Sequence, residues 1–214
     1  MAIPAPTVII PRWEWRLFAP SMKMIEDKVG AAARIDARES AEIYFLDLAG
    51  SGLQNAKIRE HTFDLKELQQ IDADGLELWK PVFRAAFPLQ RADIISAFRY
   101  WSLTPTLNRD SYSVDQFIDE LITPQPTLRV VHVFKSRRSF QYGGCIAEFT
   151  RLALNGQPLA SFSLEHEEPA CIIKALRELG LDSRLNTNYQ VGLKRALGLD
   201  KTARSLRRTP WQKK

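Results

Sequence analysis

Apolar and polar residues alternate over several stretches of the chain, which is the pattern of β-strands with one buried face. In the first stretch, Arg12 to Leu17, two arginines and a glutamate alternate with two tryptophans and a leucine. The same reasoning predicts further strands at residues 41–48, 56–66, 76–89, 128–138, 144–154 and 157–167. Gly143-Gly144 and Asn155-Gly156 separate the last three strands, and an Asn-Gly pair between alternating runs is a strong hairpin signal.

Helices are expected between and after these strands. The sequence predicts them at residues 22–33, 91–101, 114–121, 169–179 and 188–197. Pro169 suits the first turn of a helix, and Gly180 and Gly198 follow the last two predicted helices as stop signals. Runs of strands with the helices set apart from them indicate an α+β fold built on antiparallel pairing.

Size and composition favour one large domain outside any membrane. The chain has 214 residues, of which 45% are hydrophobic, and this is sufficient for a sizeable core. No apolar run approaches the roughly 20 residues that a membrane span needs, and residues 1–11 are too short and proline-rich to read as a signal peptide. Cys145 and Cys171 suggest neither a disulfide framework nor a metal knot. We therefore expect a cytoplasmic protein without a membrane partner.

The positive charge of the chain is concentrated at one end. The formal net charge is +5, but residues 201–214 contain six basic residues and no acidic one. Without those six, 24 basic residues stand against 25 acidic ones, so the rest of the chain is close to neutral. Because a basic end of this kind is most often solvated, the charge does not predict a nucleic-acid-binding domain.

The alternation also decides which charges share a face of each strand. Four same-face sets stand out: Arg12, Glu14 and Arg16; Lys57 and Arg59; Lys135 and Arg137; Glu165 and Glu167. An ordinary sheet with one face in water would explain any single strand of this kind. Pairs of equal sign are less expected on a solvated face, because adjacent like charges repel unless an opposite charge lies between them.

A ligand of each sign would relieve this repulsion. A polyanion would pair with the basic sets, and a divalent cation would pair with the two glutamates. Carboxylates at positions i and i+2 of a strand lie about 6.5 to 7 Å apart on one side, so they can share the oxygen shell of a hard cation. The strand faces therefore predict a polyphosphate site and a metal site.

Two groups of motifs follow one another along the chain. The first comprises Glu14-x-Arg16, Tyr44-Phe45-Leu46-Asp47 and Lys57-x-Arg59. The second comprises Lys135-x-Arg137, Glu148, Leu164-Glu165-His166-Glu167 and Tyr189. Their order resembles that of the CYTH superfamily, also called triphosphate tunnel metalloenzymes, over about residues 12–198.

The resemblance implies an antiparallel β-barrel or tunnel with helices packed on its outside, formed by residues 1–200 and followed by a disordered tail at 201–214. The implied phosphate-binding residues are Arg16, Lys57, Arg59, Lys66, Lys135 and Arg137. The implied ligands of Mg²⁺ or Mn²⁺ are Glu14, Glu148, Glu165 and Glu167. Glu14, Glu165 and Glu167 are also the expected catalytic residues, and Lys66 reaches the lumen only if its strand contains a bulge.

The activity implied by the resemblance is metal-dependent hydrolysis of inorganic triphosphate or of a nucleoside or thiamine triphosphate. The alternatives are an adenylate cyclase of the class IV type and a non-catalytic module that binds polyphosphate or a nucleotide. The family's entrance signature is Glu-x-Glu-x-Lys, and this chain has Arg12-x-Glu14-x-Arg16, so a cation replaces one carboxylate. That departure favours the binding module. The expected partner is a small triphosphate, with an RNA 5′ end as the one nucleic-acid candidate, and we expect a monomer or homodimer.

Overall fold

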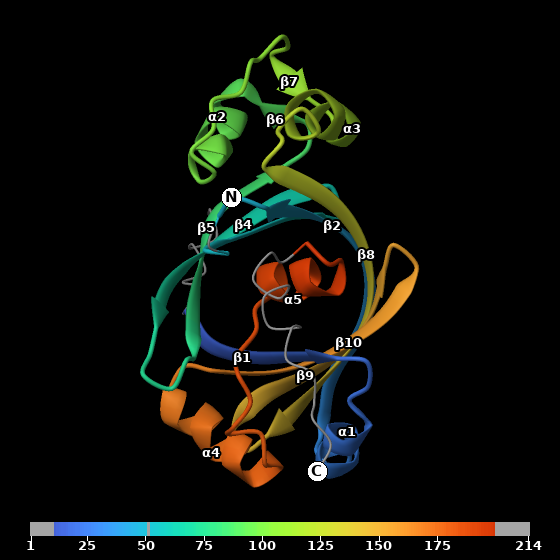
Figure 1. Cartoon of the computed structure of the whole chain (residues 1–214), viewed down its shortest axis with the longest axis vertical. Coiled ribbons are helices and arrows are strands. Elements are labelled where there is room, and N and C mark those ends of the chain that lie inside the picture. Colours follow the sequence, from blue (N-terminus) through green and yellow to red (C-terminus); the bar gives the residue numbers. More distant parts are fainter. Residues whose placement is uncertain (1–10, 51, 200–214) are drawn as a thin grey trace, which may run out of the picture.

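The centre of the molecule is a closed barrel of eight antiparallel strands (Figure 1). The computed structural model describes residues 11–50 and 52–199, so the predicted tail at 201–214 lies outside the described residues. Around the barrel the strands follow the order β1-β10-β9-β8-β2-β3-β4-β5. They are β1 (Arg12–Ala19), β2 (Arg34–Asp47), β3 (Gln54–Arg59), β4 (Thr62–Ile71), β5 (Glu77–Ala86), β8 (Leu128–Tyr142), β9 (Cys145–Leu154) and β10 (Gln157–His166). The predicted α+β fold with an antiparallel barrel is confirmed.

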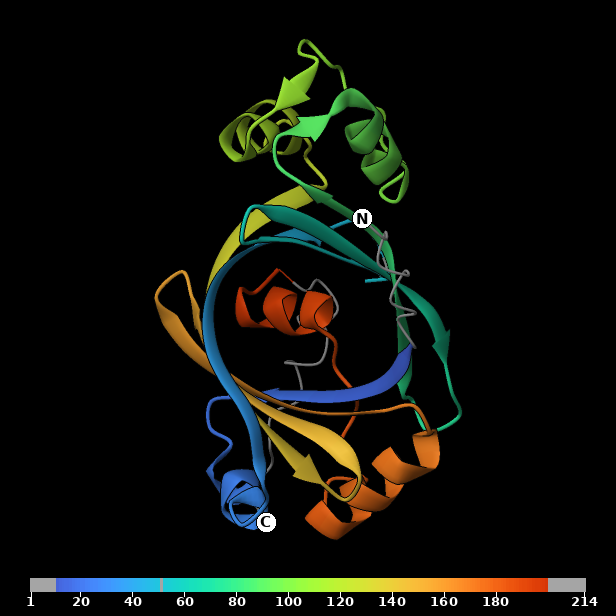
Figure 2. The same ribbon diagram turned by 180° about the vertical axis from the view of Figure 1, so that it is seen from behind.

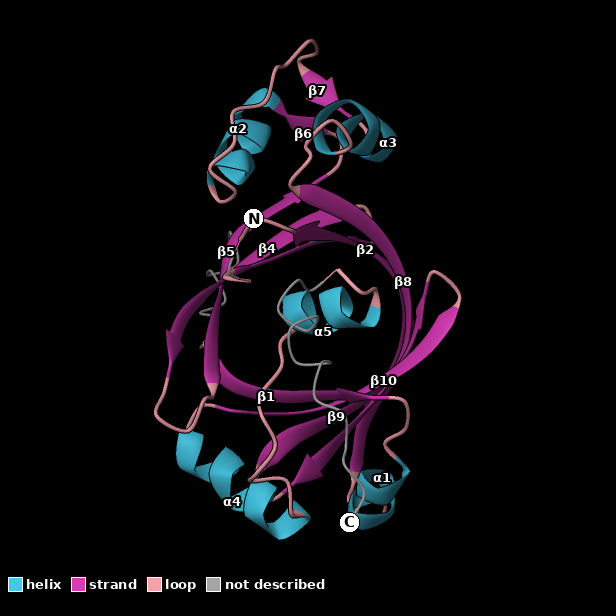
Figure 3. Cartoon of the chain, in the orientation of Figure 1, coloured by secondary structure: helices cyan, strands magenta, loops and turns pink. Residues whose placement is uncertain are grey.

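Two helices cover the outside of one wall of the barrel (Figure 3). α1 (Lys23–Val29) and α4 (Pro169–Leu179) pack on an apolar cluster that contains Trp15, Phe149 and Phe162. Pro169 stands in the first turn of α4, as predicted, and Gly180 ends it in the left-handed conformation with φ 71°. None of the helices in residues 11–50 and 52–199 is long and apolar enough to cross a bilayer.

A lobe projects from the opposite side of the barrel, between the end of β5 and the start of β8 (Figures 1 and 2). It consists of β6 (Leu89–Gln90), α2 (Arg91–Arg99), β7 (Ser111–Tyr112), α3 (Val114–Gln116) and the π-helical turn η1 (Phe117–Ile122). Phe98, Trp101 and Phe117 of the lobe pack against Phe45 and Phe63 on the outer face of the barrel. The aromatic residues of β2 and β4 that point away from the lumen therefore belong to this second core.

The structure corrects two of the predicted strands. The single strand predicted at 56–66 is a hairpin of β3 and β4, which turns at Glu60 and His61 with φ values of 50° and 56°. Neither residue is glycine, asparagine or aspartate, the usual turn residues with positive φ, so the turn carries little sequence signal. β2 begins at Arg34, seven residues before the predicted start, because its exposed polar first half pairs with the far half of β8.

The short helix α5 (Tyr189–Ala196) lies within the outline of the barrel when the molecule is seen from either side (Figures 1 and 2). Its Tyr189 and Leu193 pack against inward-facing residues that include Leu46, Val131 and Leu154. Asn188 begins the helix by accepting a hydrogen bond from the Val191 amide. One part of the lumen is therefore filled by an apolar cluster, and the rest is left to polar side chains.

Candidate functional site

The polar part of the lumen is a cavity of about 580 Å³ to which all eight barrel strands contribute. Its charged lining residues are Glu14, Arg16, Arg38, Lys57, Arg59, Asp64, Lys66, Arg84, Lys135, Arg137, Glu148 and Glu165. Tyr44, Asn55 and Tyr189 complete its polar wall. Eight basic side chains against four acidic ones make this cavity suitable for an anion of high charge.

Nine of the ten residues that the sequence singled out line this cavity, and Glu167 is the exception. β10 ends at His166, so Glu167 lies in an exposed bend and does not continue the face of Glu165. The strand stops at His166 because Pro169 begins α4 three residues later. Lys66 does reach the cavity, because the turn between β3 and β4 resets the alternation and Lys66 pairs with Asn55.

A buried carboxylate that the sequence analysis did not single out, Glu42, lies among three of the predicted cations. Lys57 Nζ and Lys135 Nζ each lie 3.1 Å from Glu42 Oε2, and an Arg137 amino group lies 3.5 Å from Glu42 Oε1. Tyr44 OH also donates to Glu42 Oε2 at 3.0 Å and accepts from Lys135. Only 1% of Glu42 and 1% of Lys135 is exposed.

Protonation in this cluster reflects burial and the three cations. Burial opposes the charge of Glu42, but Lys135 and Lys57 outweigh it and hold the pKa of Glu42 far below its usual range. Burial and the charge of Lys135 lower the pKa of Lys57 to about 8. Burial lowers the pKa of Lys135 to about 8 as well, although Glu42 acts in the opposite direction. The two lysines therefore titrate close to physiological pH.

Arg16 connects the basic and the acidic sides of the cavity. Its Nε lies 2.8 Å from Glu14 Oε1, and one amino group lies 3.8 Å from Glu148 Oε1. The guanidinium lies 4.5 Å from the centre of the Tyr189 ring, so the first residue of α5 closes the cavity over it. Only 3% of Arg16 is exposed, so these contacts are shielded from bulk solvent.

Three carboxyl groups stand in register on neighbouring strands. Glu14 of β1 lies opposite Glu165 of β10 on one side and opposite Glu77 of β5 on the other. Burial and the charge of Glu14 raise the pKa of Glu165 to about 7. Burial also raises the pKa of Glu77, which accepts hydrogen bonds from Asn188 and Trp79. Glu77 thereby fastens the start of α5 to the barrel, whereas Glu165 faces the cavity.

Polar atoms without a partner are gathered around this cavity. Among the described residues, the buried side-chain atoms that lack a hydrogen bond are Asn55 Oδ1, Arg137 Nε, Ser163 Oγ and Tyr189 OH. Three of these residues line the cavity, and the fourth, Ser163, pairs across the sheet with two lining residues. Since buried polar groups are costly without partners, their position indicates that a polar ligand or water fills the cavity.

The carboxylates fit a divalent cation that arrives with its own oxygen ligands. In residues 11–50 and 52–199, no three His, Cys, Asp or Glu side chains are arranged to hold a metal ion by themselves. Glu14 and Glu165 nevertheless line the same cavity as cross-strand neighbours on β1 and β10. Mg²⁺ is commonly held by one or two carboxylates together with phosphate oxygens and water. Glu14 and Glu165 can supply these carboxylates, and Glu148 of β9 lines the same cavity.

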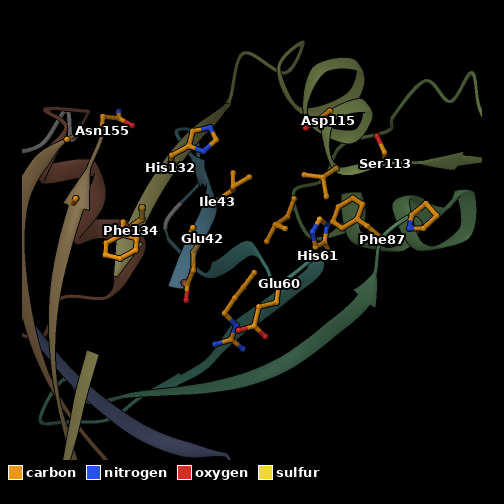
Figure 4. A pocket seen from close by; sticks show the side chains of 18 residues that line it. Glu42, Ile43, Glu60, His61, Phe87, Ser113, Asp115, His132, Phe134 and Asn155 are labelled. Atoms are coloured by element: carbon orange, nitrogen blue, oxygen red, sulfur yellow. The ribbon is translucent and has the colours of Figure 1, made fainter. Parts of the chain in front are cut away.

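A larger pocket of about 890 Å³ lies outside the barrel, between its wall and the lobe (Figure 4). Ile43, Phe87 and Phe134 give it an apolar lining, and His61 and His132 stand at different places along it. It lacks the converging charges of the inner cavity. We therefore assign the candidate site to the lumen.

Several residues of the site were missed by the sequence analysis, although the alternation contains a signal for them. Glu42 shares the face of Tyr44 in the predicted strand 41–48, and Asn55 shares the face of Lys57. Ser163 lies two residues before Glu165 on the same face. Glu77 gives no such signal, because it stands at the first position of its strand.

Comparison with known proteins finds only distant likeness. No protein-family model matches the chain, and no curated protein matches it. A candidate adenylyl cyclase from Hippeastrum with a dominant triphosphatase activity is 13% identical over 86% of this chain and 96% of its own, with a TM-score of 0.47. A protein from Pyrococcus horikoshii is 13% identical over 86% of this chain and 99% of its own, with a TM-score of 0.45. A candidate adenylate cyclase from Bacillus halodurans is 15% identical over 82% of this chain and 93% of its own, with a TM-score of 0.46. Likeness at this level carries no argument about activity.

Proposed function

We propose that the protein hydrolyses a terminal phosphoanhydride of a triphosphate, with Mg²⁺ or Mn²⁺, inside the barrel. The observation that carries the proposal is the convergence of eight basic and four acidic side chains on one cavity, three of whose lining residues have a buried polar atom without a partner. This arrangement combines a polyanion site with a wall of carboxylates, as the resemblance to the CYTH superfamily implies. Inorganic triphosphate and nucleoside or thiamine triphosphates are the candidate substrates.

The basic residues of the cavity would bind and orient the phosphate chain. Arg16 and Arg137 can each offer a planar fork of N–H donors to phosphate oxygens, and Arg137 Nε has no other partner among the described residues. Lys57, Lys135 and Lys66 would add point charges from three further directions around the barrel. Little covalent chemistry is needed from the protein in phosphoryl transfer, so positioning and charge neutralisation supply most of the catalysis.

The acidic residues of the cavity would hold the cation. Glu14 and Glu165 would bind it, with Glu148 as the third candidate, while Arg16 keeps Glu14 ionised and in place. A bound divalent cation supplies charge neutralisation on phosphate oxygens and a more acidic water. Because these carboxylates line the same cavity as the basic residues, the attacking water and the phosphate chain would meet within it.

A second candidate function, binding without turnover, is favoured by Arg12. This residue replaces the first carboxylate of the family's entrance signature, and it is exposed at the start of β1, outside the cavity lining. Together with the absence of a complete three-residue metal site in the described chain, it would leave a module that binds triphosphate only. Cyclisation of ATP remains the alternative reaction of the same site.

A panel assay separates these functions. Inorganic triphosphate, ATP and thiamine triphosphate are each incubated with Mg²⁺ and with Mn²⁺, and orthophosphate, diphosphate and cyclic AMP are measured. Release of orthophosphate that disappears with EDTA supports hydrolysis, whereas cyclic AMP with diphosphate supports the cyclase. Binding of triphosphate with no product under either metal would replace the enzyme by the binding module.

A further inference from the structure

Glu42 does not line the inner cavity itself, but its carboxylate lies against Lys57 and Lys135, which do. It projects from the middle of β2 into a cluster of cations from β3 and β8, and 1% of it is exposed. Its two oxygens receive five groups: Tyr44 OH, Lys57 and Lys135 at one oxygen, and Ser40 Oγ and Arg137 at the other. A phosphate group cannot replace it without breaking this network.

The same contacts leave the lysines free to bind a ligand. An ammonium group has three N–H donors. Lys135 uses one on Tyr44 and one on Glu42, and Lys57 uses one on Glu42. Both residues line the cavity, so the remaining donors are available to an anion. Glu42 therefore fixes the lysines without using up their hydrogen-bonding capacity.

Without the Glu42 carboxylate, the pKa values of the two lysines would fall further. Both are buried, and both already have a pKa of about 8 although Glu42 favours their charged forms. The other charged or titratable groups around the two lysines are Glu14 and Arg16 of β1, Tyr44 of β2, Arg59 of β3, Asp64 of β4, Arg137 of β8 and Tyr189 of α5. The three arginines among them favour the neutral lysines. Of the three carboxylates near the lysines, Glu42 is the one that lies 3.1 Å from both ammonium groups, so it opposes their deprotonation most directly.

We propose that Glu42 is a positioning residue that keeps Lys57 and Lys135 protonated and converged in the empty cavity, so that a triphosphate binds at neutral pH without recruiting protons. This inference rests on the proposed function, because it requires a polyanion as the ligand. It assigns to Glu42 a role in binding rather than in metal coordination or in folding alone. The proposal therefore predicts that loss of Glu42 changes the number of protons taken up when tripolyphosphate binds. An ion pair that served only to stabilise the fold would leave that number unchanged.

The test is calorimetric titration of inorganic tripolyphosphate into the full chain in EDTA, at pH 7 and pH 9, in buffers of different ionisation enthalpy. The variants are Glu42→Gln, its conservative partner Glu42→Asp, and the control Glu39→Gln, which removes an exposed carboxylate from the same strand. The ligand's own proton release is common to all of them. A difference in proton uptake between a variant and wild type at the same pH therefore reports protons taken up by the protein.

We expect Glu42→Gln to take up between one and two more protons than wild type at pH 7, because two lysines lose their partner, so that its affinity changes about 10- to 100-fold more per pH unit there. At pH 9 the difference should vanish, since the lysines are then mostly neutral in both proteins. Glu42→Asp should lie between the two, and Glu39→Gln should match wild type. Equal proton uptake by Glu42→Gln and wild type at pH 7 would overturn the proposal.

If Glu42→Gln does not fold, wild type and Lys57→Gln carry the test. Wild type should take up about one more proton than Lys57→Gln at pH 9 and the same number at pH 7, because Lys57 is charged in the empty cavity only at the lower pH. An extra proton taken up by wild type already at pH 7 would show that Lys57 is neutral in the empty cavity despite Glu42, and would reject the role of Glu42. Absence of tripolyphosphate binding by wild type at either pH instead rejects the proposed function itself.

Discussion

Glu165 of β10 lies directly opposite Glu14 of β1 in the register of the barrel, and both line the same cavity. Arg16 pairs with Glu14 at 2.8 Å, whereas burial and the charge of Glu14 raise the pKa of Glu165 to about 7. The negative charge of Glu14 is thus balanced by Arg16, whereas a negative charge on Glu165 is disfavoured. A divalent cation between them would remove this imbalance.

The first prediction concerns the double variant Glu14→Gln/Glu165→Gln. It should lose metal-dependent phosphate release from triphosphate by about 100-fold or more, because amides do not supply the charge that a hard cation requires. Binding of tripolyphosphate in EDTA should be unchanged or tighter, since two negative charges leave the cavity. Phosphate release with Mg²⁺ and calorimetry in EDTA measure the two effects.

Glu167→Gln is the matched control for this variant. Glu167 lies in the exposed bend after β10, two residues beyond Glu165, so its replacement should leave turnover unchanged. Loss of activity in Glu167→Gln, or full activity in the double variant, would place the metal site elsewhere.

The second prediction is the pH dependence of stability without metal. A carboxyl whose pKa is raised in the folded state, as Glu165 is to about 7, favours folding most when it is protonated. This contribution is complete below the ordinary pKa of glutamate and is lost as the pH rises through about 7. Between these values the melting temperature in EDTA should fall more steeply for wild type than for Glu165→Gln. Parallel melting curves for the two proteins across this range would contradict the assigned pKa.

The positions of the basic residues could be predicted from the sequence because alternation in a strand is enforced by its other face. Ala56 and Ile58 are buried in the outer core, so Lys57 and Arg59 must point to the lumen. Glu42 obeys the same rule, but it is the one charged residue on its face of the predicted strand 41–48, so no pair of equal charges marks it. Its three cationic partners come from β3 and β8, which the sequence does not show to be its neighbours.

Other errors arose where local backbone geometry decides the register. The turn at Glu60 and His61 has positive φ without glycine, so the predicted strand ran through it and gave Lys66 the wrong face. Glu167 was assigned to the face of Glu165, although its strand ends one residue earlier. The closed barrel order also depends on contacts between distant segments, such as β1 with β10, that alternation alone cannot supply.

The third prediction tests how closely α5 approaches the barrel. A Cβ atom on Gly192 would lie 2.4 Å from the Phe18 ring, which is far too close for any real contact. Gly192→Ala should therefore lower the free energy of unfolding by about 1 to 3 kcal/mol, as overpacked cores do. Chemical denaturation measures the change. Adding Phe18→Leu should restore part of the loss, and a Gly192→Ala protein as stable as wild type would show that α5 packs differently.

The fourth prediction concerns Arg137, whose Nε has no partner among the described residues although it is buried beside the cavity. Arg137→Gln should weaken tripolyphosphate binding about 10- to 100-fold, the effect of losing a charge-assisted hydrogen bond of about 1.5 to 3 kcal/mol. The control is Arg129→Gln, which removes an exposed arginine from the same strand outside the cavity. Calorimetry should find no change for the control; equal weakening in both variants would mean that binding responds to net charge alone.

If the lumen of the barrel binds a triphosphate, this ligand should raise the thermal stability of the wild-type chain. A ligand that binds only the folded protein adds about 2.7 kcal/mol at 100 times its dissociation constant. For a chain of this size that corresponds to about 5 to 10 °C in the melting temperature. Titration with inorganic tripolyphosphate should raise the melting temperature by this amount, and orthophosphate at equal ionic strength should raise it far less. A flat response to tripolyphosphate, or an equal response to both anions, would show that the lumen is not a triphosphate site.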